Sequence, residues 1–222
     1  MNAKSVLSFI IQGAAFLTIL YASYLLIMLS LPFLAFERNV DFLATKQLIY
    51  HIDAWRISFY VHVLSSPFII IAGLMQFSPW LMRKSMRLHR ISGYVYILVL
   101  LFISGPAAMI MAVYANGGYP AQTSFAILTS FWILTTYLAY RTVRKHNYEK
   151  HVCWMIRSYA LTLSAVTLRF YAYLFDVINL ELGPKETYIL LAYSSWIPNL
   201  IVAEIIIRLG YPKYLLNRKS KT

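Results

Sequence analysis

Charged side chains are scarce in this sequence. Only 13% of its 222 residues are charged and 60% are hydrophobic, whereas about a quarter of the residues of a soluble domain are charged. A soluble fold cannot cover that much apolar surface. Because roughly 20 apolar residues cross a bilayer, six spans with short loops would use nearly the whole chain. We therefore expect an all-α, polytopic membrane helix bundle of about six transmembrane helices, with residues 1–222 forming a single integral membrane domain.

Cysteine and acidic residues are also rare. Cys153 is the only cysteine, which excludes an internal disulfide, a CxxC redox pair and a cysteine-rich zinc site. Eight acidic residues face 20 Lys and Arg, so the net charge is +12. A large net positive charge can indicate nucleic-acid binding, but here the basic residues are spread among loops. We expect the lipid bilayer and its anionic head groups as their partner, and no nucleic acid.

Apolar runs alternate with short polar segments along the whole chain. Pro32 and Pro79 end the first two runs, Gly117-Gly118 separates the third from the fourth, and Gly183-Pro184 precedes the sixth. The predicted spans are 7 to 34, 58 to 81, 91 to 115, 122 to 140, 152 to 175 and 187 to 208.

The distribution of basic residues orients these spans. Three segments, 83–90, 141–150 and 208–221, carry most of the Lys and Arg and fall on one side, which the positive-inside rule assigns to the cytoplasm. Both termini are then cytoplasmic. On the other side, residues 42–55 are mildly amphipathic and are predicted to lie on the membrane surface as a short helix.

Polar residues inside a span are costly and require a partner, a cavity or a function. The fifth span has the most of them. From His151 to Asp176, polar or small residues recur within about 40° of one direction on a helical wheel. We expect this face to point into the bundle. Its polar members besides the two ends are Ser158, Thr162, Arg169 and Tyr173.

Depth divides the candidate residues into two groups. His89, Arg90, His151 and Arg157 lie near the cytoplasmic ends of their spans, and a second pair, His62 with Arg169, lies near the outer ends. The 18 residues from His151 to Arg169 correspond to about 27 Å of helix. One metal site shared by all three span histidines is therefore excluded, and two separate sites are expected.

The inner group suggests a haem site. Neutral imidazole is a good axial ligand for haem iron, and His89 and His151 lie on different helices at equal depth. Gly93, one turn after His89, would leave room for the macrocycle, and Arg90 and Arg157 would bind the propionates. The alternative is that these histidines and arginines are ordinary interfacial residues.

The outer group suggests a site for a quinone head group, a propionate or a small anion. An arginine in this position can hold an acidic group through two hydrogen bonds, and His62 lies at a similar depth. In the alternative interpretation, Arg169 forms a salt bridge with Asp176 or extends to the interface. A similar ion pair is expected between Glu204 and Arg208, one turn apart on the sixth span.

A pattern of residues between positions 58 and 171 resembles the core of a bacterial family of membrane proteins of unknown function. The resemblance implies a multi-pass protein of the bacterial cytoplasmic (inner) membrane and implies no activity. The paired histidines are also distantly similar to cytochrome b561-like and ferric-reductase-like haem proteins, although the four histidines of a two-haem protein are not matched. The pattern consists of His62, Gly73, Gln76, Phe77, LHRxxGxxY from Leu88 to Tyr96, His151, Trp154, Met155, Arg157, Ser158 and Arg169.

Two classes of function remain open from the sequence. In the first, the chain binds haem b and transfers electrons to or from a quinone or a partner protein, as an electron carrier or a membrane oxidoreductase. In the second, it is a non-enzymatic membrane subunit or assembly factor whose polar helix face contacts another membrane protein. A transporter is less favoured, because only Pro106 and Pro198 suggest broken helices.

Overall fold

The computed structural model describes residues 3–220, and the side chains of these residues except 3–12, 15, 79, 83 and 218–220. This part of the chain is helical and contains no β-strand. It consists of eleven α-helices, two 3-10 helices (η1, η2) and one π-helix (η3), some of which follow one another directly. Their bounds are α1 Ala3–Ser30, η1 Leu31–Ala35, η2 Asp41–Lys46, α2 Asp53–Gln76, α3 Pro79–Lys84, α4 Met86–Val99, η3 Leu100–Ser104, α5 Gly105–Val113, α6 Tyr119–Arg144, α7 Tyr148–Thr162, α8 Ser164–Val177, α9 Pro184–Ser194, α10 Ile197–Arg208 and α11 Tyr211–Ser220.

Six helical segments are long and apolar enough to cross a membrane, which confirms the predicted bundle. From the second span onward, their bounds lie within five residues of the predicted ones. The second span starts at Asp53, earlier than expected, because an acidic residue is favourable in the first turn of a helix. The spans are Phe16–Ala35, Asp53–Gln76, Met86–Val113, Tyr119–Arg144, Tyr148–Val177 and Pro184–Arg208.

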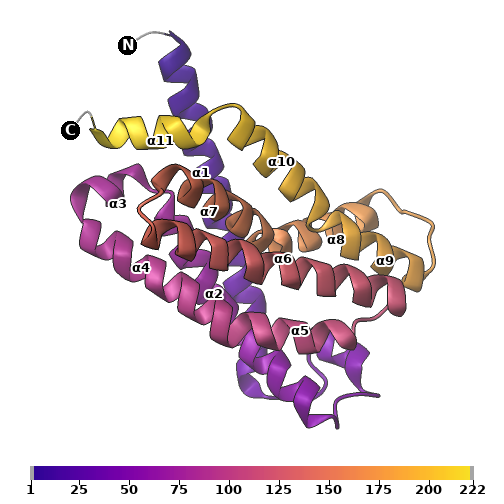
Figure 1. Cartoon of the computed structure of the whole chain (residues 1–222). Coiled ribbons are helices and arrows are strands. Elements are labelled where there is room, and N and C mark those ends of the chain that lie inside the picture. Colours follow the sequence, from indigo (N-terminus) through magenta and orange to yellow (C-terminus); the bar gives the residue numbers. More distant parts are fainter. Residues whose placement is uncertain (1–2, 221–222) are drawn as a thin grey trace.

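The helices run roughly along one axis, with α11 at one end and the segment between α1 and α2 at the other (Figure 1). Helix α6 packs along α7, and α2 packs along α4 and α5. A cluster of large buried side chains fills the space between them, including Ile69, Tyr96, Trp132 and Tyr159. The core is therefore built mainly by the second to fifth spans.

Three spans are interrupted along their length. The third passes through the π-helix η3 before Pro106, and the sixth breaks between α9 and α10 before Pro198. The fifth breaks at Leu163, where the sequence has no proline. This break corrects the prediction of one continuous inward polar face: in α7 that face is buried, whereas no residue of α8 is buried.

The segment before α2 forms a folded cap and not the predicted surface helix. It contains two short 3-10 helices and several turns. Its apolar residues pack with Trp55 and Phe59 of α2 in a second core cluster that includes Phe33 and Leu43. Burial of these side chains against the bundle replaces the expected burial in the membrane interface.

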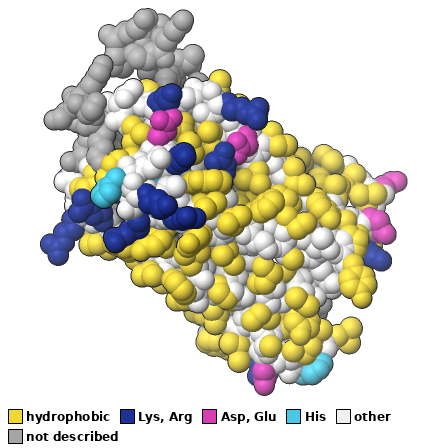
Figure 2. Space-filling view, in the orientation of Figure 1, with side chains coloured by type: hydrophobic (Ala, Val, Ile, Leu, Met, Phe, Trp, Pro, Cys, Tyr) yellow, Lys and Arg dark blue, Asp and Glu magenta, His cyan; other side chains and the backbone are white. Residues whose placement is uncertain are grey.

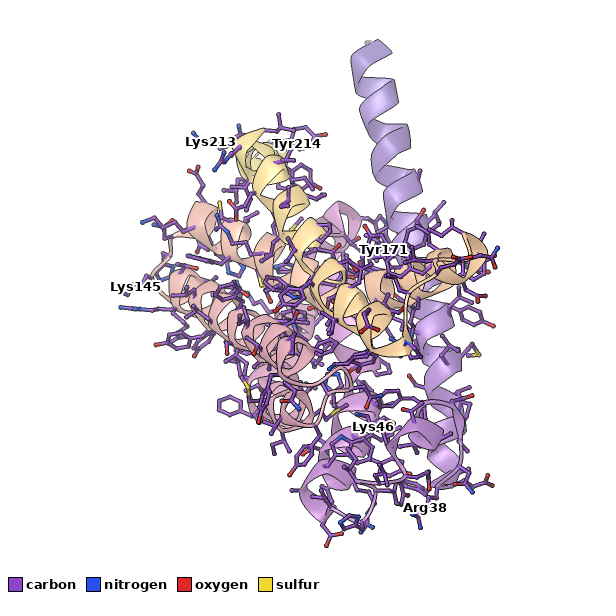
Figure 3. All side chains as sticks on the ribbon, turned by 90° about the vertical axis from the view of Figure 1, so that its right-hand side faces the viewer. Arg38, Lys46, Lys145, Tyr171, Lys213 and Tyr214 are labelled. Atoms are coloured by element: carbon purple, nitrogen blue, oxygen red, sulfur yellow. The ribbon has the colours of Figure 1, made fainter. Side chains whose placement is uncertain are left out.

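Basic side chains gather at one end of the molecule, and hydrophobic side chains cover its middle (Figure 2). We call this end, where α3 meets α4, α6 meets α7, and α11 lies, the basic end. Lys145 and Lys213 lie there, whereas Arg38 and Lys46 lie at the opposite end (Figure 3). The assignment of the basic end to the cytoplasm stays a prediction.

Candidate functional site

A cavity of about 430 Å³ opens at the basic end. Four of the residues predicted for the inner site line it: His89, Arg90, Gly93 and His151. They come from the first turns of α4 and from α7, whose N-terminal ends converge here. The other lining residues are Gln76, Phe77, Met82, Met86, Tyr94, Ile97, Tyr140, Val143, Arg144, His146, Tyr148, Val152, Met155, Leu215 and Leu216.

His151 is held in one orientation by the backbone of a neighbouring helix. Asn147 caps α7 by accepting a hydrogen bond from the backbone N–H of Lys150 at 3.2 Å. One turn later, Nδ1 of His151 lies 2.9 Å from the carbonyl oxygen of Ala139 on α6. A carbonyl only accepts hydrogen bonds, so Nδ1 must carry the proton. The neutral imidazole then keeps its lone pair on Nε2, the arrangement found in metal-ligating histidines.

His89 lies in the first turn of α4, after the capping residue Ser85. Its backbone carbonyl accepts a hydrogen bond from Nε2 of Gln76 at 3.0 Å. The Oε1 atom of Gln76 lies 3.2 Å from the position that a Cβ of Gly93 would occupy. The missing side chain of Gly93 thus makes room for the Gln76 amide, which ties α2 to α4 beside His89.

The cavity lining includes residues that the sequence interpretation missed. Leu215 and Leu216 of α11 line it, and Leu215 is buried. His146 also lines it and bonds to the Tyr148 hydroxyl through Nδ1 at 3.2 Å. The apolar Leu-Leu pair within an otherwise basic tail was the only sequence sign that this tail packs against the bundle.

Arg157 does not line this cavity. It lies on another side of α7, where its Nε and Nη2 donate to the two carboxylate oxygens of Glu204 at 2.5 and 2.9 Å. Its guanidinium also lies over the Trp154 ring, 4.6 Å from the ring centroid. The expected Glu204–Arg208 pair is thus replaced by a contact between α7 and α10, because the bidentate geometry of Arg157 gives Glu204 two hydrogen bonds.

The outer residues lie in a separate region. Nδ1 of His62 is 2.9 Å from Oγ and 3.2 Å from the carbonyl oxygen of Ser104, in the π-helix η3. The imidazole and the Trp132 ring form a T-shaped contact, with centroids 6.3 Å apart. Such π-helical turns are frequent at functional sites. His62 is thereby fixed, as His151 is, through its Nδ1 atom.

Arg169 lies on α8 and donates from Nη1 to the carbonyl of Ala165 at 3.0 Å. The ion pairs found among the described residues do not include one between Arg169 and Asp176. The salt-bridge alternative for Arg169 is therefore absent from this structure.

A buried hydroxyl network separates the two regions. The Tyr96 hydroxyl bonds to Ser158 at 2.7 Å and to Thr162 at 2.8 Å. Trp132 donates from Nε1 to Thr162 at 2.9 Å. An indole N–H is a donor only, so this chain of hydroxyl groups cannot pass a proton through Trp132 toward His62. We interpret the network as a structural link between the third, fourth and fifth spans.

A family model described as "Predicted membrane protein (DUF2306)" matches residues 59–207. The match includes every predicted site residue and most or all of each span from the second to the sixth. No curated protein and no solved structure matches the chain.

Proposed function

The chain belongs to the DUF2306 family of predicted membrane proteins, and from the two histidines in its inner cavity we propose that it binds haem b and transfers electrons to or from a quinone or a partner protein. The bilayer that holds it would be the bacterial inner membrane. Haem would supply one-electron chemistry. The chain would supply the axial ligands, the orientation of the macrocycle and the protein surface for electron exchange.

The observation that carries this proposal is that His89 and His151, from different helices, line one cavity. The hydrogen bond from Nδ1 of His151 to Ala139 leaves Nε2 as the coordinating atom. A hydrogen bond from the other ring nitrogen to a carbonyl also raises the basicity of a ligating imidazole. Two neutral imidazoles are a suitable axial pair for b-type haem iron.

The remaining lining suits a flat apolar cofactor with acidic groups. Met82, Met86 and Met155 are flexible apolar side chains that adapt to irregular shapes. Arg90 and Arg144 would bind the propionates. Arg144 replaces Arg157 as the expected second propionate ligand, because Arg157 is paired with Glu204 outside this cavity. The Leu-Leu pair of α11 would cover the mouth of the site.

For the outer residues, we propose a quinone head group as the ligand. The Ser104 hydroxyl would donate to Nδ1 of His62, so that Nε2 would carry the proton and donate it to one quinone oxygen. Arg169 would bond to the second oxygen with donors that Ala165 leaves unused. Reoxidation of the reduced protein by a short-chain ubiquinone analogue should then slow by at least tenfold in His62→Ala and in Arg169→Gln, with unchanged haem bands. Equal rates in all three proteins would contradict the quinone assignment.

The absorption spectrum of the purified protein tests the haem proposal. After expression with added haem, we expect a Soret band that shifts on reduction by dithionite. His89→Ala and His151→Ala should each lose this spectrum, whereas His51→Ala, an exposed histidine at the opposite end, should keep it. A wild-type protein without a Soret band would refute haem binding and favour the alternative of a non-enzymatic membrane subunit. Bands that persist unchanged in both ligand variants would refute the ligand assignment.

A further inference from the structure

A second hollow lies on the side of α7 that carries Arg157. It has a volume of about 580 Å³ and is bounded by α6, α7 and α10. Its walls are mainly apolar and include Leu134, Ile201 and Ile205, which are 48%, 55% and 51% exposed. These residues lie within membrane spans, so the groove opens toward the lipid.

The charged residues of the groove are concentrated toward the basic end. They are Arg157, Glu204 and Arg208, and Arg208 is the last residue of α10. The bidentate pair of Arg157 with Glu204 is neutral, so Arg208 leaves one net positive charge. A guanidinium has five N–H donors and Glu204 uses two of those on Arg157. Three donors of Arg157 and all of Arg208 can therefore serve a ligand.

The length of the groove matches one leaflet of a bilayer. Along α10 it extends from Leu200 to Arg208, which is eight residues or about 12 Å of helix. Half of the hydrocarbon thickness is about 15 Å. An acyl chain lying along the apolar part would therefore place its head group at the level of Arg208.

We propose that this groove binds a monoanionic phospholipid such as phosphatidylglycerol. The acyl chain packs against the apolar walls, and the phosphate accepts hydrogen bonds from Arg208 and from the remaining donors of Arg157. Basic pockets between transmembrane helices near the cytoplasmic surface are typical sites for anionic lipids. The site is independent of haem, because α7 separates it from the cavity that His151 lines.

Trp154 provides a local probe, because it lines the groove and lies over Arg157. The protein is placed in phosphatidylcholine vesicles that contain equal fractions of either brominated phosphatidylglycerol or brominated phosphatidylcholine. Bromine quenches nearby tryptophan fluorescence. The contribution of Trp154 is the difference between the wild-type protein and Trp154→Phe. The quenching by brominated phosphatidylglycerol is divided by the quenching by brominated phosphatidylcholine. Any quenching that is the same in both measurements, such as that by a bound haem, cancels in this ratio.

We expect brominated phosphatidylglycerol to quench Trp154 about fivefold more strongly than brominated phosphatidylcholine does, because the groove prefers the anionic lipid. Arg208→Gln should reduce this ratio to about one. Lys213→Gln removes the same charge at the basic end but outside the groove, and it should keep the preference. Circular dichroism would show that each variant is folded.

Three outcomes would overturn the proposal. The first is equal quenching of Trp154 by the two lipids in the wild-type protein. The second is a preference that Arg208→Gln leaves unchanged. The third is quenching of the other tryptophans by both lipids while Trp154 is protected, since that result would place a protein segment in the groove.

Discussion

Lys46 shows how a single residue can depart from the expectation for its type. It lies in the cap at the end opposite the basic end (Figure 3) and is only 3% exposed. Its Nζ donates to the carbonyl of Tyr114 at 2.6 Å and to Oδ1 of Asn116 at 2.7 Å. The rings of Phe42 and Trp55 lie over the ammonium group. Lys46 therefore fastens the cap to the turn between the third and fourth spans.

Burial lowers the pKa of Lys46 from 10.5 to about 8. Because the folded protein releases this proton at a lower pH than the unfolded chain, its stability should rise as the pH increases from about 8 to 10.5. The gain should be about 1 to 3 kcal/mol. Thermal melts in detergent across this pH range would measure it. Lys46→Met has no titrating group at this position. If the melting temperatures of the two proteins depended on pH in the same way, the prediction would be contradicted.

Gly73 is a residue whose lack of a side chain allows the core to close. A Cβ atom at this position would collide with the Tyr159 ring and lie 2.9 Å from Cε2 of Tyr96. Hydrogen bonds hold both rings in place. Gly73→Ala should destabilise the fold by about 1 to 3 kcal/mol, seen as a lower melting temperature in detergent. Gly13→Ala is the control, because a Cβ there would meet open space, and it should not lower the melting temperature. If the two substitutions lowered the melting temperature equally, the packing argument would be refuted.

At the scale of elements, the break between α7 and α8 is stabilised by a side chain of another helix. Asn199 of α10 donates from Nδ2 to the carbonyl of Ala160 at 3.1 Å and to Oγ1 of Thr167 at 2.9 Å. It thereby bonds residues on both sides of Leu163. Beyond the break, α8, which carries Arg169, has no buried residue.

Asn199→Leu should therefore destabilise the protein by about 1 to 2 kcal/mol, because it leaves the Ala160 carbonyl without this donor inside the membrane. Unfolding in mixed detergent would measure the loss. Ser194→Ala is the matched control, since the Ser194 hydroxyl bonds within its own helix, and it should change stability by less than about 0.5 kcal/mol. If both variants unfold alike, Asn199 does not hold the break.

At the scale of the whole molecule, the separation of charge predicts how the protein lies in the membrane. Lys145 lies in the turn between α6 and α7, and Lys185 lies in the first turn of α9 at the opposite end of the bundle. In a Cys153→Ala background, Lys185→Cys should react with a membrane-impermeant maleimide in intact cells. Lys145→Cys should react only after permeabilisation, because the positive-inside rule predicts that the basic end faces the cytoplasm. The reverse labelling pattern would overturn the orientation and with it the assignment of the cavity to the cytoplasmic side.

The sequence by itself determined the class of the protein and the number and approximate bounds of its spans. These follow from local hydrophobicity, because each transmembrane helix satisfies its own backbone hydrogen bonds and must present an apolar surface. The sequence also separated His89 and His151 from His62, since depth along a helix depends only on residue spacing. The grouping of the first pair around one cavity agrees with that separation.

Only the tertiary structure decided which polar groups meet. Arg157 pairs with Glu204, 47 residues away, and no local pattern could choose that partner over Arg208. The burial of Lys46, the contribution of α11 to the cavity lining and the break at Leu163 likewise depend on groups distant in the chain. Helix periodicity gives the faces of each span, but the contacts between spans depend on how all six pack together.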